Sequence, residues 1–380
     1  MPWSWRRRSG RRNPDSNAAM GKLPLQRGPN LLEEGRESCY VSGMEARRGS
    51  PQLGRAFTVG LVQMAMSADP RENLERTEKH IAGAARAGAD LVCLPELFRS
   101  RYFCQREDAA NFDLAEPIPG PTTRALGKIA QAKRLVIIAP IFERRASGIY
   151  HNSAAVLDST GEIAGVYRKM HIPDDPAYFE KYYFTPGDLG FHAVETRVGR
   201  IATLICWDQW YPEGARLAAL RGANVLFYPT AIGWHPDEKA RHGAAQRDAW
   251  RTVQRGHAIA NGVYVAAVNR VGFEPGSIAK ADGSSAARRE AAKGIEFWGS
   301  SFLCDPFGIV VAEATSDREE VLIGRVEPAR IEEVRRNWPF LRDRRVDAYG
   351  GIESRYLDES VARRKIGRAK KAAPRSAAPR

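Results

Sequence analysis

Three side chains with catalytic chemistry stand at the ends of predicted strands: Cys206, Glu96 and Lys169. Cys206 follows the apolar run 201–205 and precedes a helix predicted from Glu213, so its thiol is expected at a sharp strand-to-helix turn. The free backbone N–H groups of a helix start favour a thiolate and can hold an oxyanion. A small core thiol fits the segment equally well, since free cysteine is among the most buried residue types.

Glu96 and Lys169 would complete the chemistry of a thiol nucleophile. Glu96 follows the predicted strand 90–95 and Lys169 follows the predicted strand 162–168, and strand ends in layered α/β folds line a common crevice. A carboxylate there can take the thiol proton and later activate a water, and an ammonium can hold the charge of a tetrahedral oxyanion. Taken singly, Glu96 is more typical of a helix N-cap or first-turn residue than of a catalytic base, and Lys169 is more typical of a solvated hairpin end.

The surrounding pattern predicts a layered α/β fold. Strands are expected at 57–64, 90–95, 135–139, 151–158, 162–168, 200–206, 223–229, 263–268, 297–304, 308–313 and 320–326, and helices at 71–87, 119–133, 213–221, 243–261 and 328–336. Such alternation buries strands between helices and other strands. We expect one domain from 57 to 350, with a mobile surface loop at 274–294 that is rich in Gly, Ser, Ala and Lys.

The net charge of +13 lies outside the predicted domain. Residues 1–56 carry +6 and residues 355–380 carry +7, so residues 57–354 carry no net charge. Both basic tails, 1–56 and 351–380, are rich in Arg, Pro, Ser and Ala, and we expect them to be disordered. Specific nucleic-acid binding would need this charge on a folded face with groove-reading or stacking elements, so no nucleic-acid partner is expected.

The remaining composition indicates an ordinary cytosolic protein. No apolar run follows the paired arginines within residues 13–56, and none reaches the roughly 18 residues of a membrane span, so we expect a soluble protein without an export signal or a membrane segment. The five cysteines are odd in number and scattered, which favours a reducing cytosol over a disulfide framework. No metal-ligand spacing is visible, and we expect neither a metal nor a cofactor.

Three segments are far more specific together than singly. The runs at 94–98 (LPELF), 167–173 (YRKMHIP) and 204–213 (LICWDQWYPE) resemble, in order and spacing, the three catalytic motifs of the nitrilase (carbon–nitrogen hydrolase) superfamily. The similarity extends through the flanking runs 102–105, 180–188 and 228–233. It covers about 57–350 and leaves out both tails and the loop at 274–294. This resemblance implies a four-layer α-β-β-α sandwich that pairs through a helical face into homodimers or larger homo-oligomers.

The resemblance also assigns roles. It implies that Cys206 is the nucleophile, Glu96 the general base, and Lys169 with the backbone N–H of Trp207 the oxyanion stabilisers. A second carboxylate supports the lysine and the water in this superfamily, and Glu180 matches it. The four side chains together argue against a catalytically silent binding relative, the non-enzymatic alternative, since loss of catalysis would remove the need for them.

The flanking runs look most like the branch of the superfamily that hydrolyses N-carbamoylputrescine. This similarity implies attack on the ureido carbonyl of an N-carbamoyl amine, with putrescine, carbon dioxide and ammonia as products and polyamine formation as the context. A distal ammonium needs a carboxylate or an aromatic face, for which Tyr102, Asp174, Asp175 and Trp234 are candidates. The two aspartates equally fit local backbone acceptors in the turn at 173–176.

Two further alternatives stay open at this stage. An N-carbamoyl amino acid would need a cation for its carboxylate, and Arg99, Arg101 and Arg241 are candidates, while a plain aliphatic amide would need neither charge. His171 invites a competing Cys–His dyad, but its place in the lysine motif favours structural hydrogen bonds. His257, between apolar neighbours on the long helix, is expected to be a satisfied core histidine.

Overall fold

A computed structural model describes residues 54–276 and 294–357. The predictions for the two basic tails and for the loop at 274–294 fall almost entirely outside these residues. At the described edge of that loop the structure differs from the prediction, because Glu274 is buried and ends a strand. Within the described ranges, every helix is too short or too polar to cross a bilayer.

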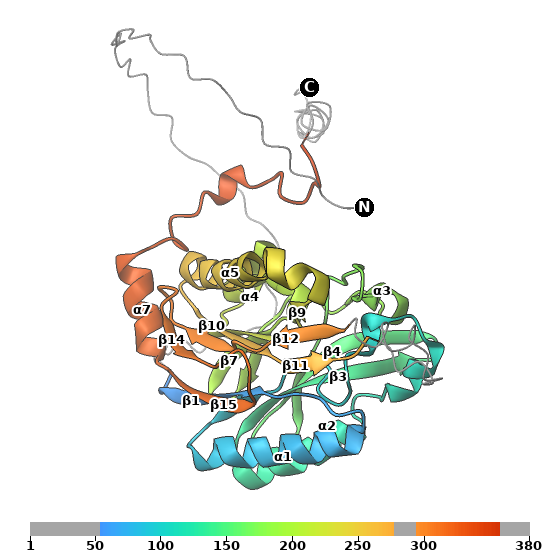
Figure 1. Cartoon of the computed structure of the whole chain (residues 1–380). Helices are drawn as coiled ribbons and strands as arrows, with labels where there is room; N and C mark the ends of the chain where they lie inside the picture. Colours follow the sequence, from blue (N-terminus) through green and yellow to red (C-terminus); the bar gives the residue numbers. More distant parts are fainter. Residues whose placement is uncertain (1–53, 277–293, 358–380) are drawn as a thin grey trace, which may run out of the picture. The chain divides into compact units, whose positions relative to one another are not determined.

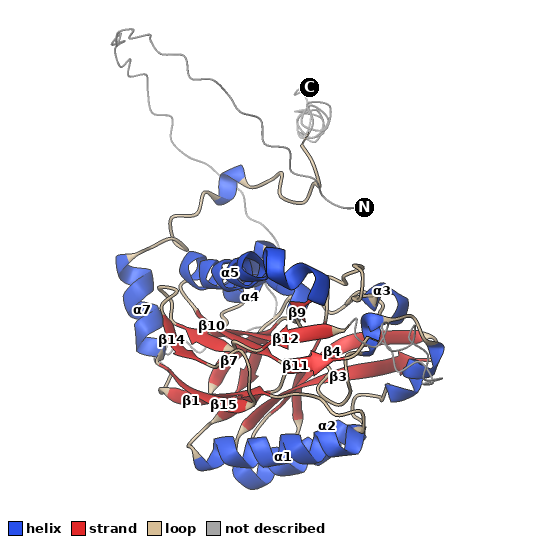
Figure 2. Cartoon of the chain, viewed as in Figure 1, coloured by secondary structure: helices blue, strands red, loops and turns tan. Residues whose placement is uncertain are grey.

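Two six-stranded sheets form the centre of the fold (Figures 1 and 2). The first has the order β15 (Glu320–Val326), β1 (Phe57–Gln63), β2 (Leu91–Cys93), β3 (Val136–Ala146), β4 (Ile149–Leu157) and β5 (Ile163–Arg168). The second has the order β14 (Val310–Glu313), β13 (Phe302–Cys304), β10 (Tyr264–Asn269), β8 (Val225–Thr230), β7 (Gly199–Thr203) and β6 (Val194–Thr196). A small third sheet joins β11 (Val271–Glu274), β12 (Ile295–Trp298) and β9 (Gly233–Trp234).

Each large sheet carries helices on one face. Helices α1 (Pro70–Arg86) and α2 (Pro121–Lys133) pack on the first sheet, and α4 (Pro212–Leu220) and α5 (Pro236–Asn261) pack on the second (Figure 1). Two further helices, α3 (Glu180–Tyr183) and α7 (Pro328–Asn337), follow β5 and β15 in the chain. The central strands β1, β2 and β3, and likewise β7, β8 and β10, run parallel, as βαβ connections require.

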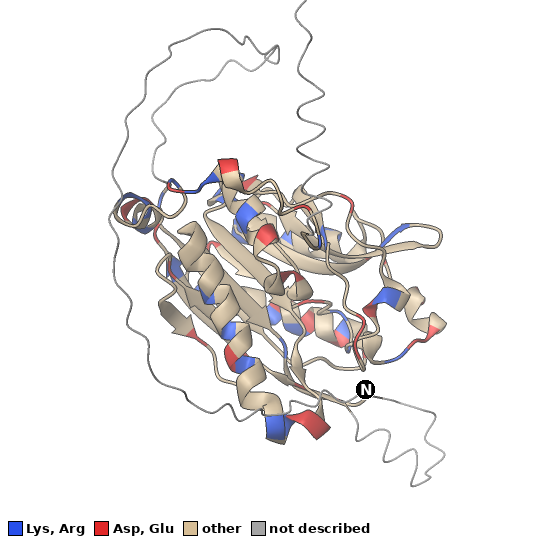
Figure 3. Ribbon diagram, turned by 90° about the horizontal axis from the view of Figure 1, so that it is seen from above, with Lys and Arg blue, Asp and Glu red and all other residues tan. Residues whose placement is uncertain are grey.

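Side chains that alternate along the strands divide the core into layers. On β1, Leu61 points between the sheets, where it shares a core with Ile201 and Val225, whereas Val62 packs with Ile81 of α1. This alternation follows from the two-residue period of a strand whose two faces are both buried. The predicted four-layer α-β-β-α sandwich is therefore confirmed. Along the ribbon in Figure 3, acidic (red) and basic (blue) residues are interspersed over the described part, in keeping with zero net charge for residues 57–354.

The structure corrects several element boundaries. Helix α5 begins at Pro236, seven residues before the predicted start at 243, because proline at the first helical position suits a helix start. Strand β3 continues to Ala146 and turns through Gly148, which has φ +72°, into β4. The segment after β7 is not an α-helix start, since a 3-10 turn, Cys206–Trp210, precedes α4.

Gly187 provides a test of how the backbone beside Lys169 is held. Its N–H donates to the Lys169 carbonyl at 2.8 Å, and an added Cβ would lie 2.1 Å from the Arg168 carbonyl oxygen. We expect Gly187→Ala to lower the free energy of unfolding in urea by at least about 2 kcal/mol, because backbone cannot yield as a flexible side chain does. Gly83→Ala on α1, whose Cβ would meet nothing nearer than 3.9 Å, should raise it by up to about 1 kcal/mol. Equal effects of the two substitutions would contradict this account.

Candidate active site

A buried ammonium lies between two buried carboxylates. The Lys169 Nζ atom donates to Glu96 Oε1 at 2.8 Å and to Glu180 Oε2 at 2.6 Å, and all three side chains are at most 1% exposed. Glu96 follows β2, Lys169 directly follows β5, and Glu180 begins α3. The structure thus brings together three of the residues that the sequence placed at one site.

The two oxygens of Glu96 have different surroundings. Oε1 accepts a second hydrogen bond from Asn152 Nδ2 at 2.7 Å, in addition to the one from Lys169. Oε2 is buried and has no hydrogen-bond partner among the described residues. A carboxylate that is anchored through one oxygen and open at the other can exchange a proton without changing its position.

Burial and mutual charge set the protonation of the cluster. Burial, opposed by the Lys169 ammonium, raises the pKa of Glu180 to about 7. Burial alone would lower the pKa of Lys169, but the Glu180 and Glu96 carboxylates outweigh it and raise that pKa well above its usual value. The ammonium therefore stays charged over the neutral range, as an oxyanion stabiliser must.

Cys206 opens the 3-10 turn with φ +44°, a left-handed conformation that side chains rarely adopt. Its thiol is 5% exposed and lies 3.9 Å from the Ala231 carbonyl oxygen. Burial and the Glu96 charge raise the pKa of the thiol well above its usual value, although Lys169 opposes them. Because α4 starts only at Pro212, the thiol does not lie at an α-helix start as the sequence predicts. A thiol with a raised pKa needs a base to take its proton.

Asp208 connects the cysteine turn to the lysine segment. Its carboxylate accepts hydrogen bonds from the backbone N–H groups of Ile205, at 2.9 Å, and His171, at 3.0 Å, and from the Tyr167 hydroxyl, at 2.8 Å. A buried carboxylate with three donors fixes the two segments relative to each other. The resulting link holds residues 205 and 171, and with them the neighbouring thiol and ammonium.

Both histidines singled out in the sequence have structural partners. His171 Nδ1 lies 2.8 Å from Asp208 Oδ1, and its ring stacks on Tyr211 with centroids 3.7 Å apart. Among the described residues, the Cys206 sulfur has a polar contact with the Ala231 carbonyl oxygen and none with His171, so no contact supports a Cys–His dyad. His257 is buried with Nε2 2.8 Å from the Gln209 carbonyl oxygen, so the prediction of a satisfied core histidine is confirmed.

A cavity of about 620 Å³ opens over Cys206. Its lining includes Glu180 and Trp207, and the aromatic residues Tyr178, Trp210 and Trp298; at its rim lie His235 and the acidic residues Asp175, Asp237 and Glu238. The lining drawn from the described residues contains neither lysine nor arginine. Such a cavity favours a ligand that is neutral at the thiol end and cationic at the far end.

The predicted substrate-binding residues divide into two groups. Asp175 lines the cavity, as predicted, whereas Tyr102, Asp174 and Trp234 do not. The Tyr102 hydroxyl instead donates to Glu180 Oε1 at 2.6 Å, and the Trp234 ring packs beneath Lys239 at 4.8 Å. Asp174 is exposed in the loop before α3. Their side-chain directions, which the sequence does not specify, turn these three away from the cavity.

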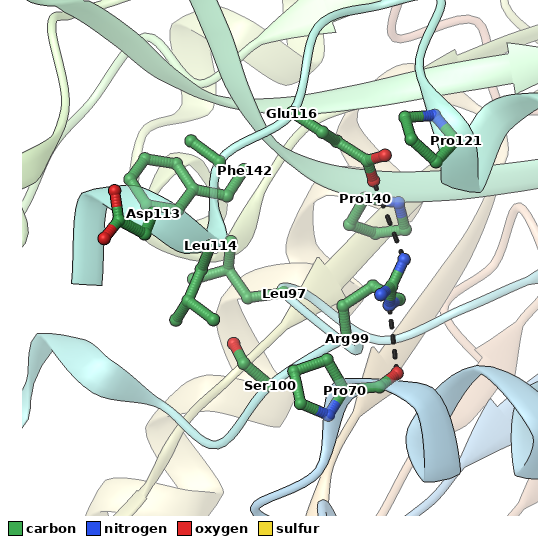
Figure 4. A pocket seen from close by; sticks show the side chains of 11 residues that line it. Pro70, Leu97, Arg99, Ser100, Asp113, Leu114, Glu116, Pro121, Pro140 and Phe142 are labelled. Carbon is green, nitrogen blue, oxygen red and sulfur yellow. Dashed lines mark hydrogen bonds and ion pairs between the residues drawn. The ribbon is translucent and has the colours of Figure 1, made fainter. Parts of the chain in front are cut away.

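The three arginines that the sequence offers as partners for an anionic substrate also lie outside the lining of this cavity. Arg99 lines a separate hollow of about 190 Å³, where its Nε donates to the Pro70 carbonyl oxygen at 3.1 Å and its Nη1 lies 4.0 Å from Glu116 (Figure 4). This hollow shares no lining residue with the cavity over Cys206, and Arg101 and Arg241 are likewise absent from that lining.

Sequence reasoning missed several site residues. Asp237 and Glu238 carried a readable signal, because acidic residues after a proline are typical of a first helical turn, and α5 starts there. Asn152, Asp208 and Trp298 carried none, since their roles arise only from strand pairing and tertiary packing.

The fold and this site together define a class of enzyme. The family model for carbon–nitrogen hydrolases matches residues 58–336, and the chain belongs to that family. It is accordingly a hydrolase that acts on carbon–nitrogen bonds, as the sequence predicts.

Two relatives and one solved structure are similar to this chain over most of its length. The N-carbamoylputrescine amidase of Solanum lycopersicum is 42% identical over 299 residues, which are 78% of this chain and 95% of the relative. The citrullinase of Francisella tularensis subsp. tularensis is 38% identical, over 78% of this chain and 98% of its own. The crystal structure of a carbon–nitrogen hydrolase from Helicobacter pylori G27 is 44% identical with a TM-score of 0.74, covering 80% of this chain and all of that one.

The raised pKa of Glu180 predicts a pH dependence of stability. The folded protein holds a proton on Glu180 up to about pH 7, whereas the unfolded chain releases it near its ordinary value of 4.5. The folded state therefore binds more protons between these values, and the free energy of unfolding should fall by about 3 kcal/mol as the pH rises through this window.

Urea unfolding of Glu180→Gln at pH 5 and pH 8 tests this expectation. The variant should lack the part of the decline that comes from Glu180, whereas Glu162→Gln, at an exposed position, should keep it. The same decline in all three proteins would contradict the assignment to Glu180.

Proposed function

We propose that this enzyme hydrolyses the ureido C–N bond of N-carbamoylputrescine, giving putrescine, carbon dioxide and ammonia. The observation that carries the proposal is the cavity over Cys206, with acidic residues at its rim and neither lysine nor arginine in its described lining. A distal ammonium suits such a rim, and a neutral ureido group suits the thiol end. The similarity to the N-carbamoylputrescine amidase of Solanum lycopersicum supports the same substrate.

The proposed first half of the reaction forms a thioester. Glu96 takes the thiol proton through its open Oε2, and the Cys206 sulfur attacks the ureido carbonyl carbon. Lys169 and the backbone N–H of Trp207 hold the oxyanion. The C–N bond then breaks, the leaving amine takes the proton from Glu96, and a carbamoyl thioester stays on Cys206.

The second half releases the enzyme. Glu96 takes a proton from water, whose oxygen attacks the thioester carbonyl, and the C–S bond breaks as the thiol regains a proton. The carbamate product decays to carbon dioxide and ammonia. Glu180 supports this step by holding Lys169 from the other side, at 2.6 Å.

A second candidate is hydrolysis of a ureido amino acid, which the similarity to the citrullinase of Francisella tularensis subsp. tularensis favours. Such a substrate adds a carboxylate to the distal end, and that carboxylate needs a cation. None of Arg99, Arg101 and Arg241 lies in the cavity lining, so the cationic substrate is the better supported of the two.

We further propose a cytoplasmic homodimer or larger homo-oligomer that contributes to polyamine formation. Leu217 and Leu220 of α4 and Ile259 of α5 are large apolar side chains exposed by 38% or more on the helical layer, as an interface between subunits would need. Light scattering of the purified protein tests the assembly.

The substrate and the nucleophile are tested together by ammonia release. We expect turnover of N-carbamoylputrescine and its loss by at least about 1,000-fold in Cys206→Ala, because a thioester cannot form without the sulfur. Citrulline and N-carbamoyl-β-alanine, compared side by side, should react far more slowly. Preference for either would move the proposal to ureido amino acids.

The acidic rim is tested by removing its charge. The double substitution Asp237→Asn/Glu238→Gln should raise KM for N-carbamoylputrescine by about 10-fold, or about 1.4 kcal/mol, with little change in kcat, because the rim contacts the distal ammonium in ground and transition states alike. Asp248→Asn, an exposed change on α5 outside the lining, is the matched control. An unchanged KM in the double variant would remove the rim from substrate binding.

A further inference from the structure

We propose that the buried ion pair of Arg270 and Glu274 positions the general base Glu96; this inference rests on the proposed role of Glu96. Arg270 ends up fully buried just after β10, and its Nη1 donates to Glu274 Oε1 at 2.7 Å, four residues along the chain in β11. Neither side chain touches the cavity over Cys206. They are positioning residues, not catalytic ones.

The guanidinium reaches the backbone of the base itself. Arg270 Nη2 donates to the carbonyl oxygens of Glu96, at 2.8 Å, and Leu97, at 2.9 Å. Leu97 has φ +50°, a left-handed conformation that is strained for a residue with a Cβ and persists only where its surroundings fix it. Two charge-assisted hydrogen bonds from one rigid guanidinium supply that fixing.

The partner carboxylate extends the contact to the second glutamate. Glu274 Oε2 accepts from the Tyr102 backbone N–H, and the Tyr102 hydroxyl donates to Glu180 Oε1 at 2.6 Å. Since Glu180 and Glu96 share Lys169, the contacts close into a ring of six residues, which are Glu96, Lys169, Glu180, Tyr102, Glu274 and Arg270. The ion pair therefore holds the base at its backbone, and holds Glu180 through Tyr102.

Stability alone does not account for a pair so deeply buried. Removing two charges from water costs about as much as their attraction returns, and well-packed apolar residues of similar size commonly serve as well or better. What apolar residues cannot supply is donors for the Glu96 and Leu97 carbonyls and an acceptor for the Tyr102 N–H. The pair is suited to fixing the geometry of the base.

The double variant Arg270→Met/Glu274→Met separates these roles, because it leaves no unpaired charge. We expect it to stay folded in the absence of urea but to unfold at a lower urea concentration than the unaltered protein, because the Glu96 and Leu97 carbonyls and the Tyr102 N–H lose their partners. Its kcat for N-carbamoylputrescine should fall by about 100-fold, the effect of a base displaced by about 1 Å, with KM changed by less than about threefold. The matched control is Arg336→Met/Glu332→Met, the same residue types four apart on α7 but exposed, which should keep kcat.

A second readout needs no substrate. Alkylation of Cys206 by iodoacetamide, followed by the mass of its peptide, reports proton removal from the thiol by Glu96. Both Glu96→Gln and the double variant should be alkylated about 100-fold more slowly at pH 7 than the unaltered protein. Failure of the substrate proposal alone would abolish ureide turnover in every protein and leave this pattern intact.

Three results would overturn the positioning role. The double variant could keep both kcat and the alkylation rate, or it could lose them only in proportion to the fraction unfolded, in which case the pair is structural. Unchanged alkylation in Glu96→Gln would reject the base assignment, and the positioning of that base with it.

Discussion

The structure depends on one ammonium that is removed from water and shared by two carboxylates. Lys169 is fully buried, and its contacts with the buried carboxyl groups of Glu96 and Glu180 make that burial tolerable. Each carboxylate in turn is tolerable only because the ammonium is there. The fold has to deliver these groups from three separate segments, after β2, after β5 and at the start of α3, to within hydrogen-bond distance. A sandwich of two sheets does this because strand ends, and not strand centres, are where a polar side chain can leave the apolar layers.

The thiol reaches this cluster from the other sheet. Cys206 follows β7, and the left-handed start of its 3-10 turn, together with the bonds of Asp208 to Ile205 and His171, fixes it beside the lysine segment. Burial raises the pKa of the Cys206 thiol, and Glu96 Oε2 is a buried acceptor without a hydrogen-bond partner among the described residues. The proposed proton transfer would use both properties.

The sequence predicts the sandwich and the four reactive side chains, but not their supporting contacts. Alternating strands and helices indicate layers directly, and Glu96, Lys169, Glu180 and Cys206 stand in motifs whose order and spacing are specific. Tyr102, Asp174 and Trp234 were misplaced because residue type and neighbourhood do not determine which way a side chain points. Asn152 and Arg270 gave no signal because a buried polar residue in a strand acquires its meaning from the segment that the fold places opposite it.

Helix α5 connects the cavity to an exposed part of the helical layer. Its first turn carries the rim residues Asp237 and Glu238, and its last turn carries the exposed Ile259. Twenty-six residues make a helix about 39 Å long. The acidic lining residues and the exposed apolar residue thus belong to one continuous element, so the position of the first turn depends on the packing of the last.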